Sequence, residues 1–486
     1  MKKPLMKLTF ERLVILITFL AIFAMAARIS VDSDTWWHLR AGQWMLETGR
    51  IPDSDPFSYT RYGAEWHYPG WLVEIPMYGI FKVFGAGGLN LWTAVMVCLA
   101  FVFIWKTTEG NIYVRAFTMI LAAAASGVYW AARPYLVTFV FSAAYIWLFE
   151  TMRKNEYRSI RRDAVWLLIL MVLWTNSHGG FFIGFLVWGV YLFSGVIGWI
   201  TQKHDFGVIK SLMISGLLLA GCVCINPYGL EMLAYPFKTV GISALQNYIQ
   251  EWQSPNFHEI NVQPFAWLIL LVLAAVGFSG RKMLWSDFFL AGGFAFMGLM
   301  AGRNIALFSL TAPMVVTRHC SPLLDGFMHS KLGLSSTRSV TRRQNILNWI
   351  ILALLVFTVL AKVTLVFPVS ANEQAFQKIF PVGAVNYIEQ TKPAGRIFNS
   401  YNWGGYLLWA LPEYPVFIDG RTDLYDDELI DEWIKVVQGQ DGWEQTLDEW
   451  HVTFILIEPG MNVTSLLKDG WRLNYEDAMA QVWVRK

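Results

Sequence analysis

The chain has 486 residues, of which 55% are hydrophobic and only 15% are charged. Its mean hydropathy of +0.40 is far higher than a soluble domain needs to fill a core. The formal net charge is only +2, and the basic residues cluster in particular loops instead of forming a stripe interleaved with aromatic side chains. This pattern excludes nucleic acid as an expected partner and predicts a polytopic membrane protein.

Apolar segments long enough to cross about 30 Å of hydrocarbon recur along the chain. The first, Leu13 to Ile29, follows a basic start and lacks a small-residue cleavage site, so we predict a retained helix with a cytoplasmic N-terminus. Later segments bring the predicted number of transmembrane helices to about eleven. These segments are 88–105, 114–130, 134–150, 164–176, 180–200, 208–225, 263–279, 285–301, 303–318 and 346–367.

The stretch 70–84 is ambiguous, because it is apolar but carries charged residues and a proline. Lys and Arg accumulate in cytoplasmic loops, and the basic stretch 151–163 lies inside only if 70–84 does not cross the membrane. The same topology keeps the basic loop 318–343 inside. It places the remaining polar turns, the 226–262 loop and everything after Phe367 on the extracytoplasmic side.

The composition changes after the last apolar segment, where the chain becomes charged and rich in Gly and Asp. We therefore divide it into a transmembrane part, 1–368, with an outward loop at 30–87, and a small extracytoplasmic α/β domain, 369–486. The elements expected in this domain are β-like runs at Val416 to Ile418 and Thr453 to Ile457 and helical stretches at Ala384 to Glu389 and Glu428 to Val437.

The most informative polar stretch, Ser30 to Arg40, directly follows the first apolar segment and contains two acids, a tandem tryptophan and a histidine. Ionisable groups at a bilayer edge are costly unless they pair, meet water or do chemistry. Trp36 and Trp37 suit the aromatic belt at a membrane interface. This stretch is the first place where we expect a functional site, with Asp34, Asp32 and His38 as candidate catalytic residues and Trp36 and Trp37 as candidate substrate-binding residues.

Asp32 and Asp34 allow a structural and a chemical interpretation. As an N-cap, Asp34 would start an interfacial helix from Thr35 to about Thr48, ended by Gly49, with His38 one turn beyond the cap. As a carboxylate at the water edge of a membrane cavity, either acid can accept the proton of an attacking hydroxyl or amide. The pair can also hold a divalent cation such as Mg²⁺ or Mn²⁺ through its oxygens.

Two arginines lie in short outward turns between predicted spans, Arg133 in Ala131 to Pro134 and Arg303 in Ala301 to Asn304. A guanidinium can grip a phosphate through two parallel hydrogen bonds. The alternative is that both side chains merely extend to the lipid headgroups. Arg133 and Arg303 are therefore candidates for binding the phosphate of a membrane lipid.

Two further outward segments supply candidate binding residues. His178 lies in the turn Trp174 to Gly180, whose paired glycines let the backbone approach a ligand closely, although a hydrogen-bonded turn histidine explains it equally well. The 226–262 loop offers Glu251, Trp252 and His258, a combination suited to a sugar or a metal. Its spacing matches no strong zinc pattern, so the metal remains unknown.

The outward loop with its early acidic pair, the polytopic body and the extracytoplasmic tail together resemble the GT-C superfamily of membrane glycosyltransferases. This superfamily includes protein O-mannosyltransferases, aminoarabinose transferases and oligosaccharyltransferases. The resemblance implies a sugar donor carried on a polyprenyl phosphate or pyrophosphate, and Asp34 or else Asp32 as general base or metal ligand. It also implies that Arg133, Arg303 or a cation stabilises the leaving lipid phosphate.

One motif departs from the oligosaccharyltransferase pattern, because Trp36-Trp37 is followed by His38 and not by the aspartate of the tryptophan-tryptophan-aspartate signature. This difference favours transfer of one sugar or a short glycan over en bloc transfer to asparagine. The acceptor implied by the resemblance is an extracytoplasmic protein, lipid or glycan, and the expected location is a bacterial inner membrane.

Three other functions stay open at this point. A lipid-linked glycan transporter or scramblase would use the same arginines but would need no catalytic carboxylate. A polysaccharide polymerase or ligase would differ in the length of its product. An assembly protein of an envelope polysaccharide system would use the tail for docking and would tolerate changes to the loop acids.

Overall fold

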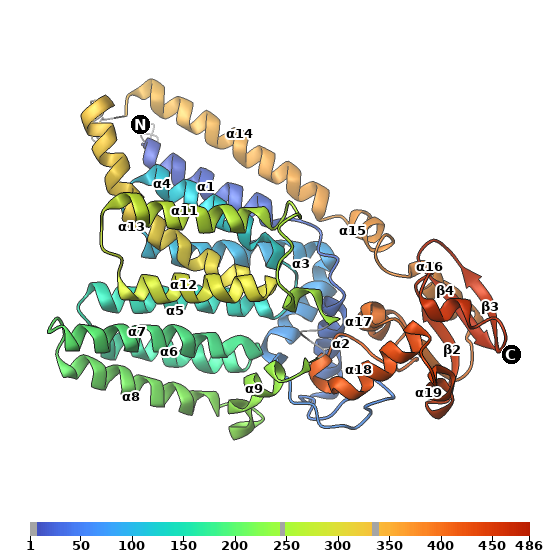
Figure 1. The fold of residues 1–486 in the computed structure, drawn as a ribbon. Helices are drawn as coiled ribbons and strands as arrows, with labels where there is room; N and C mark the ends of the chain where they lie inside the picture. Colours follow the sequence, from blue (N-terminus) through green and yellow to red (C-terminus); the bar gives the residue numbers. More distant parts are fainter. Residues whose placement is uncertain (1–6, 244–247, 333–339) are drawn as a thin grey trace.

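The computed structural model describes residues 7–243, 248–332 and 340–486 (Figure 1). The first six residues, which belong to the predicted basic N-terminus, lie outside these ranges, as do 244–247 of the 226–262 loop and 333–339 of the predicted cytoplasmic loop. A bundle of long helices occupies one end of the molecule, and short helices with a small sheet occupy the other (Figure 1).

Every predicted apolar segment falls on a helix of the bundle. These helices are α1 (Phe10–Ala26), α3 (Trp71–Thr107), α4 (Ile112–Ser126), α5 (Tyr135–Lys154), α6 (Ile160–Thr175), α7 (Phe182–Ile200), α8 (Phe206–Val223), α11 (Gln263–Ser279), α12 (Trp285–Met300), α13 (Ile305–Leu332) and α14 (Arg342–Val366). Within the described ranges, 6 helical segments are long and apolar enough to cross a membrane, and α11 and α12 are shorter apolar helices. The number of crossings stays a prediction.

Three helices differ from their predicted bounds. Helix α1 ends at Ala26, so that Arg28, which lies inside the predicted segment, is outside the helix. Helix α3 includes 70–84 almost entirely but is interrupted at Gly85, whose φ of 62° is accessible to glycine at little cost. Helix α13 continues to Leu332 through two prolines, well beyond the predicted end at 318.

Helix α2 (Asp34–Thr48) lies between the bundle and the tail (Figure 1). The predicted helix and its end are confirmed, because Gly49 has left-handed backbone angles and its N–H donates to the carbonyl of Met45. The predicted N-cap is wrong. Ser33 holds that position, and Asp34 is the first helical residue because the Oδ1 of Asp32 accepts a hydrogen bond of 2.9 Å from the Asp34 N–H.

The tail contains short helices and a 4-stranded sheet with the order β1-β2-β4-β3. Its elements are α15 (Val369–Phe376), α16 (Val382–Thr391), β1 (Arg396–Asn399), α17 (Tyr401–Ala410), α18 (Thr422–Gln438), α19 (Trp443–Glu449), β2 (Val452–Ile457), β3 (Trp471–Glu476) and β4 (Gln481–Arg485). Strands β1 and β2 are parallel, and the other pairs are antiparallel. Helices α16 and α18 and strand β2 confirm three of the predicted elements.

The β-like run from Val416 to Ile418 was predicted as a strand, and this prediction is wrong. The run is extended and buried, but its only β contact in the described chain is an isolated bridge between Val416 and Ser58. It pairs with the outward loop because the N–H of Tyr59 donates to the carbonyl of Val416 at 3.2 Å. Its hydrophobic side chains therefore fill a core without joining the sheet.

The molecule has two hydrophobic cores, one within the bundle and one that joins α2, the start of α3 and the tail. Trp36 and Trp37 belong to the second core, with exposed fractions of 6% and 4%, so they do not form the predicted interfacial belt. The Trp36 ring contacts Phe376 and Tyr406 of the tail at centroid distances of 5.1 and 5.4 Å. Burial of each such side chain contributes roughly 1.5–3 kcal/mol, which anchors α2 and the acids at its start.

Candidate functional site

Arg133, in the turn before α5, lies at the centre of a cluster of carboxylates. Its Nη2 is 2.7 Å from Oδ2 of Asp34, and its Nη1 is 3.3 Å from Oδ2 of Asp32. The same Nη1 is 3.5 Å from Oε2 of Glu251. Three turns that are far apart in the sequence thus meet around one guanidinium, and these side chains keep exposed fractions of 16% to 36%.

Arg303, in the short 3₁₀ helix η5 (Gly302–Asn304), extends this cluster. Its Nη1 is 3.6 Å from Oε1 of Glu251, so one carboxylate bridges both predicted arginines. Its guanidinium lies 4.4 Å from the ring centroid of Trp252, a distance typical of a cation–π contact. The N–H of Gly302 donates to the carbonyl of Gln253 at 3.0 Å and joins the two turns.

A cavity of about 800 Å³ opens beside this cluster and is lined by Asp32, Arg133, Glu251 and Arg303. Arg28 also lines it, and sequence reasoning missed this residue because it lay hidden at the end of an apolar run. Its Nη2 donates to the carbonyls of Gly127 and Trp130 at 2.6 and 2.7 Å. Among the residues that the structure describes, Arg28 has no carboxylate partner, so its charge is available to an anionic ligand.

The tail closes the other side of Asp34. A Cβ atom at Gly420 would lie 1.9 Å from the Oδ1 of Asp34, so only glycine allows this approach. The neighbouring Arg421 is fully buried and binds Asp55 of the outward loop at 2.6 Å and Asp419 at 2.7 Å. Sequence analysis did not predict this contact between Gly420 and Asp34.

Two acids of the site have opposite pKa shifts. Burial raises the pKa of Asp34 to about 7, against the lowering effect of Arg133 and with a further rise from Asp32. Burial also opposes the charge of Glu251, but Arg133 and Arg303 hold the pKa of that carboxyl below its usual value. Asp34 therefore titrates near neutral pH while Glu251 stays ionised, a division of roles typical of acid–base sites.

The three predicted histidines lie in different surroundings. His38 is buried against α3, with its Nδ1 2.7 Å from Oε1 of Glu74, and burial holds its pKa well below the usual value. Nδ1 of His178 accepts a hydrogen bond of 3.0 Å from the N–H of Gly180, and burial lowers its pKa to about 3. His258 lies on the exposed part of its loop. Both buried histidines are therefore neutral at physiological pH.

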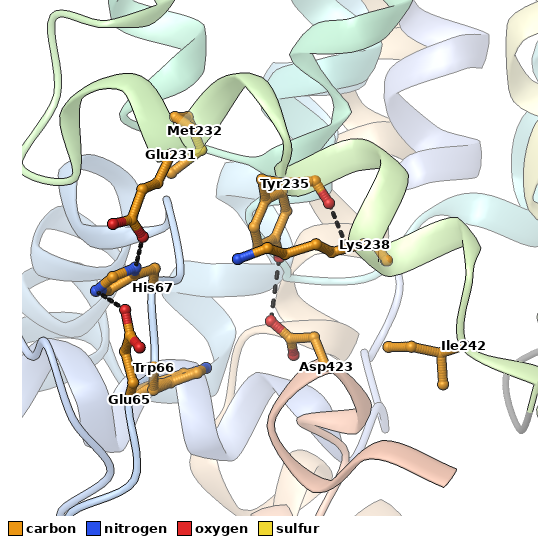
Figure 2. A pocket seen from close by; sticks show the side chains of 10 residues that line it. Glu65, Trp66, His67, Glu231, Met232, Tyr235, Lys238, Ile242 and Asp423 are labelled. Atoms are coloured by element: carbon orange, nitrogen blue, oxygen red, sulfur yellow. Dashed lines mark hydrogen bonds and ion pairs between the residues drawn. The ribbon is translucent and has the colours of Figure 1, made fainter.

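A second group of polar side chains, which sequence analysis did not identify, lies near the outward loop (Figure 2). Glu65, His67 and Glu231 offer ligand atoms that all lie within 4.8 Å of one another. They line a pocket of about 160 Å³ together with Tyr235 and Asp423. No short-range motif could have revealed the group, because Glu231 comes from η3 (Gly229–Leu233), far along the chain.

Known proteins resemble this chain in structure but not detectably in sequence. No protein-family model matches the sequence, and no curated protein matches it. The oligosaccharyltransferase AglB from Archaeoglobus fulgidus, in complex with an inhibitory peptide and a dolichol-phosphate, has a TM-score of 0.59 at 12% identity, over 98% of this chain and 74% of that chain. The oligosaccharyltransferase of the same organism, tethered to an acceptor peptide with the NVT sequon, has a TM-score of 0.57 at 12% identity, over 91% and 68%.

A lower TM-score of 0.47, at 12% identity, relates the chain to ArnT from Cupriavidus metallidurans bound to undecaprenyl phosphate, over 97% of both chains. The likenesses above 0.5 cover nearly the whole of this chain, from the first helix of the bundle to the sheet of the tail. They confirm the resemblance suggested by the outward loop, the helical body and the tail. The chain has the fold of the GT-C superfamily of membrane glycosyltransferases.

Proposed function

We propose that this protein is an integral membrane glycosyltransferase that transfers a sugar from a polyprenyl-phosphate-linked donor to an extracytoplasmic acceptor, with Asp34 as the general base. The observation that carries the proposal is the position of Asp34. It contacts Arg133, which lines a large cavity with other cationic side chains, and burial raises its pKa to about 7. A general base works best when its pKa is close to the operating pH.

In the proposed reaction an acceptor O–H or N–H attacks the anomeric carbon of the donor sugar. The new bond to the acceptor forms while the bond between the anomeric carbon and the lipid phosphate oxygen breaks. The acceptor proton passes to the carboxylate of Asp34, and the bonding electron pair leaves with the lipid phosphate. Asp32 and Glu251 hold Arg133 in place beside Asp34 and keep the pair oriented.

The leaving phosphate gains negative charge, so the proposal requires cations on the cavity wall. Arg28 is the best placed, because its guanidinium bonds only to carbonyl oxygens in the described chain. Arg133 also keeps a buried Nε without a hydrogen-bond partner among the described residues. Arg303 shares Glu251 with Arg133 and lies on the wall of the same cavity.

A divalent cation between Asp32 and Asp34 does not fit this arrangement. The guanidinium of Arg133 contacts both carboxylates and occupies the position in which a shared metal ion would lie. Among the residues that the structure describes, His and carboxylate ligands converge instead at Glu65, His67 and Glu231. The proposed mechanism therefore uses no metal at the acidic pair.

The proposal also specifies the orientation of the chain in the membrane. The N-terminus lies in the cytoplasm, and 30–87 and 369–486 lie on the extracytoplasmic side of a bacterial inner membrane, where lipid-linked donors present their sugars. The loop charges support this orientation. The bounds 1–368 and 369–486 describe the two parts, although their side chains share the second core.

The decisive experiment measures sugar transfer by the purified protein in lipid, from a panel of radiolabelled polyprenyl-phosphate and polyprenyl-pyrophosphate sugars. Wild type, Asp34→Asn and Asp32→Asn are compared with Glu47→Gln, a control at the exposed end of the same helix. We expect Asp34→Asn to lose transfer and to keep donor binding. Full transfer by Asp34→Asn would refute the base assignment, and donor translocation without transfer by the wild type would favour a transporter.

A further inference from the structure

We propose that Glu65, His67 and Glu231 form a binding site for one divalent transition-metal ion of the Zn²⁺ class. The site lies apart from Asp34 and connects the outward loop to the segment after α8. The inference does not depend on the glycosyltransferase assignment.

The geometry places three ligands of suitable chemistry together. Nδ1 of His67 is 2.9 Å from Oε2 of Glu231, and Nε2 of His67 is 3.3 Å from Oε1 of Glu65 (Figure 2). The side chains of Glu65 and Glu231 are 71% and 56% exposed, and that of His67 is 23% exposed. An ion can therefore enter from solvent, and either glutamate can rotate toward the nitrogen that the ion occupies.

The local charge favours a cation. Two carboxylates face one imidazole, and in the part of the chain that the structure describes neither carboxylate pairs with a lysine or arginine. Lys238 lines the same pocket, but no ion pair joins it to Glu65 or Glu231 in those ranges. A bound dication neutralises the two negative charges, whereas a neutral imidazole leaves them uncompensated.

The ring of Tyr228 fixes the orientation of the His67 imidazole. The ring of Tyr228 stacks on His67 with a centroid distance of 4.7 Å and an interplanar angle of 28°. The Tyr228 hydroxyl contacts the carbonyls of Pro52 and Tyr68 at 3.1 and 3.2 Å, which ties the stacking ring to the same outward loop. A fixed histidine loses less freedom when it binds a metal, and its orientation is set before the ion arrives.

The ligand types select the ion. Imidazole nitrogen and carboxylate oxygen are both ligand types that zinc takes, and three protein ligands would leave one tetrahedral position open. Mg²⁺ and Ca²⁺ prefer sites made entirely of oxygen ligands, so they should bind much more weakly here. The pocket that Tyr235 and Asp423 also line would leave room for a water or an anionic ligand to complete the coordination.

The test uses the full-length protein in lipid nanodiscs, stripped with a chelator and titrated with Zn²⁺ and, separately, with Co²⁺. The metal content of the re-isolated protein and the visible absorption of Co²⁺ are the readouts. We expect about one ion per chain, bound at least about tenfold more weakly by His67→Gln and Glu231→Gln. His451→Gln, an exposed tail histidine, is the matched control and should bind like the wild type.

Absence of Zn²⁺ uptake by the wild type, or equal uptake by wild type and His67→Gln, would overturn the proposal. In that case His67 only bridges the two glutamates through polar contacts. If the other variants are unstable, Glu65→Gln replaces them and should also bind Zn²⁺ more weakly than the wild type. The highly exposed Glu65 can be changed without disturbing a hydrophobic core. Metal content is measured without any sugar donor, so failure here is separate from failure of the proposed transferase activity.

Discussion

Two arginine–carboxylate clusters that link the outward loop to other parts of the molecule have similar composition and very different surroundings. Arg133 contacts Asp32, Asp34 and Glu251 beside a cavity, with 16% of its side chain exposed. Arg421 contacts Asp55 and Asp419, and these three side chains have an exposed fraction of 0%. The hydroxyl of Tyr425 donates to Oδ2 of Asp419 at 2.7 Å and further satisfies this second cluster.

This difference separates the proposed site for chemistry from a structural link. A sealed cluster has no room for a ligand, and its charges serve to hold the outward loop against the tail. In the open cluster the pKa values of Asp34 and Glu251 shift in opposite directions, and a cavity of about 800 Å³ lies beside it. The two clusters meet at Gly420, which packs closely against Asp34 and directly precedes Arg421 in the sequence.

The largest expected effect is on transfer, in the open cluster. Asp34→Asn should lower the rate of sugar transfer by about 10²–10⁴-fold, because the amide cannot accept the acceptor proton. Initial rates at saturating donor, together with thermal unfolding, measure this effect. The unfolding temperature of this variant should not fall. A parallel loss of stability and activity would mean that Asp34, like Arg421, mainly stabilises the fold.

The opposite pattern is expected in the sealed cluster. Arg421→Ala should cost about 3–5 kcal/mol of stability, because Asp55 and Asp419 are left buried without a counter-charge. Thermal unfolding in detergent measures the change. Arg485→Ala is the control, since Arg485 and its partner Asp448 are 42% and 58% exposed and should contribute little. Equal effects of both variants would contradict the assignment.

A third prediction concerns the contact between the two clusters. Gly420→Ala should lower transfer about 10²-fold while changing stability little, because the added methyl group displaces the Asp34 carboxylate. The matched control is Gly470→Ala, in which the new methyl group meets no atom within 4 Å. Unchanged kinetics in Gly420→Ala would show that the tail does not position the base.

The fourth prediction is a pH dependence. Transfer should fall about tenfold per pH unit below pH 7, where Asp34 is protonated, and should level off above that value. Stability should change in the opposite direction. The folded pKa of about 7 lies above the unfolded pKa of about 4, so the stabilising contribution of the proton is complete below pH 4 and is lost as the pH rises through 7.

A comparison of wild type with Asp34→Asn tests the pH dependence of the transfer rate and that of the stability. The variant should lose the pH dependence of stability in that range and should gain stability relative to wild type above pH 7. An unchanged stability profile would assign the titration to another group.

The smallest expected effect concerns Arg28. Arg28→Gln should lower kcat/KM for the lipid-linked donor about tenfold, as expected for one charge-assisted hydrogen bond worth about 1.5 kcal/mol. Donor titrations over a range of ionic strength measure it. A loss confined to kcat would indicate that Arg28 acts on the transition state alone.

The helical part of the fold was predictable because hydrocarbon thickness dictates long apolar runs, and every such run lies on a helix. The bounds of α2 were also predictable, because Gly49 ends it with left-handed geometry. The bend at Gly85 and the extension of α13 depend on packing that hydropathy does not report. The isolated run at Val416 has strand-like composition, but its pairing partner lies in the outward loop.

The site was partly predictable for a similar reason. Asp34, Arg133 and Glu251 were identified individually as polar residues in outward turns, and the structure brings them together. The pairing of Asp55 with Arg421 was not accessible, since 366 residues separate them. The group around His67 also depends on contact between distant loops, so local sequence carries no signal for it.

The second hydrophobic core sets an order of events during synthesis. Trp36, Trp37 and Asp55 emerge from the ribosome long before the tail that covers them, so a nascent chain exposes these side chains until translation is nearly finished. A chain that lacked the tail would leave Trp36 and Trp37 without the side chains that bury them, so the residues at the start of α2 depend on a segment more than 300 positions away.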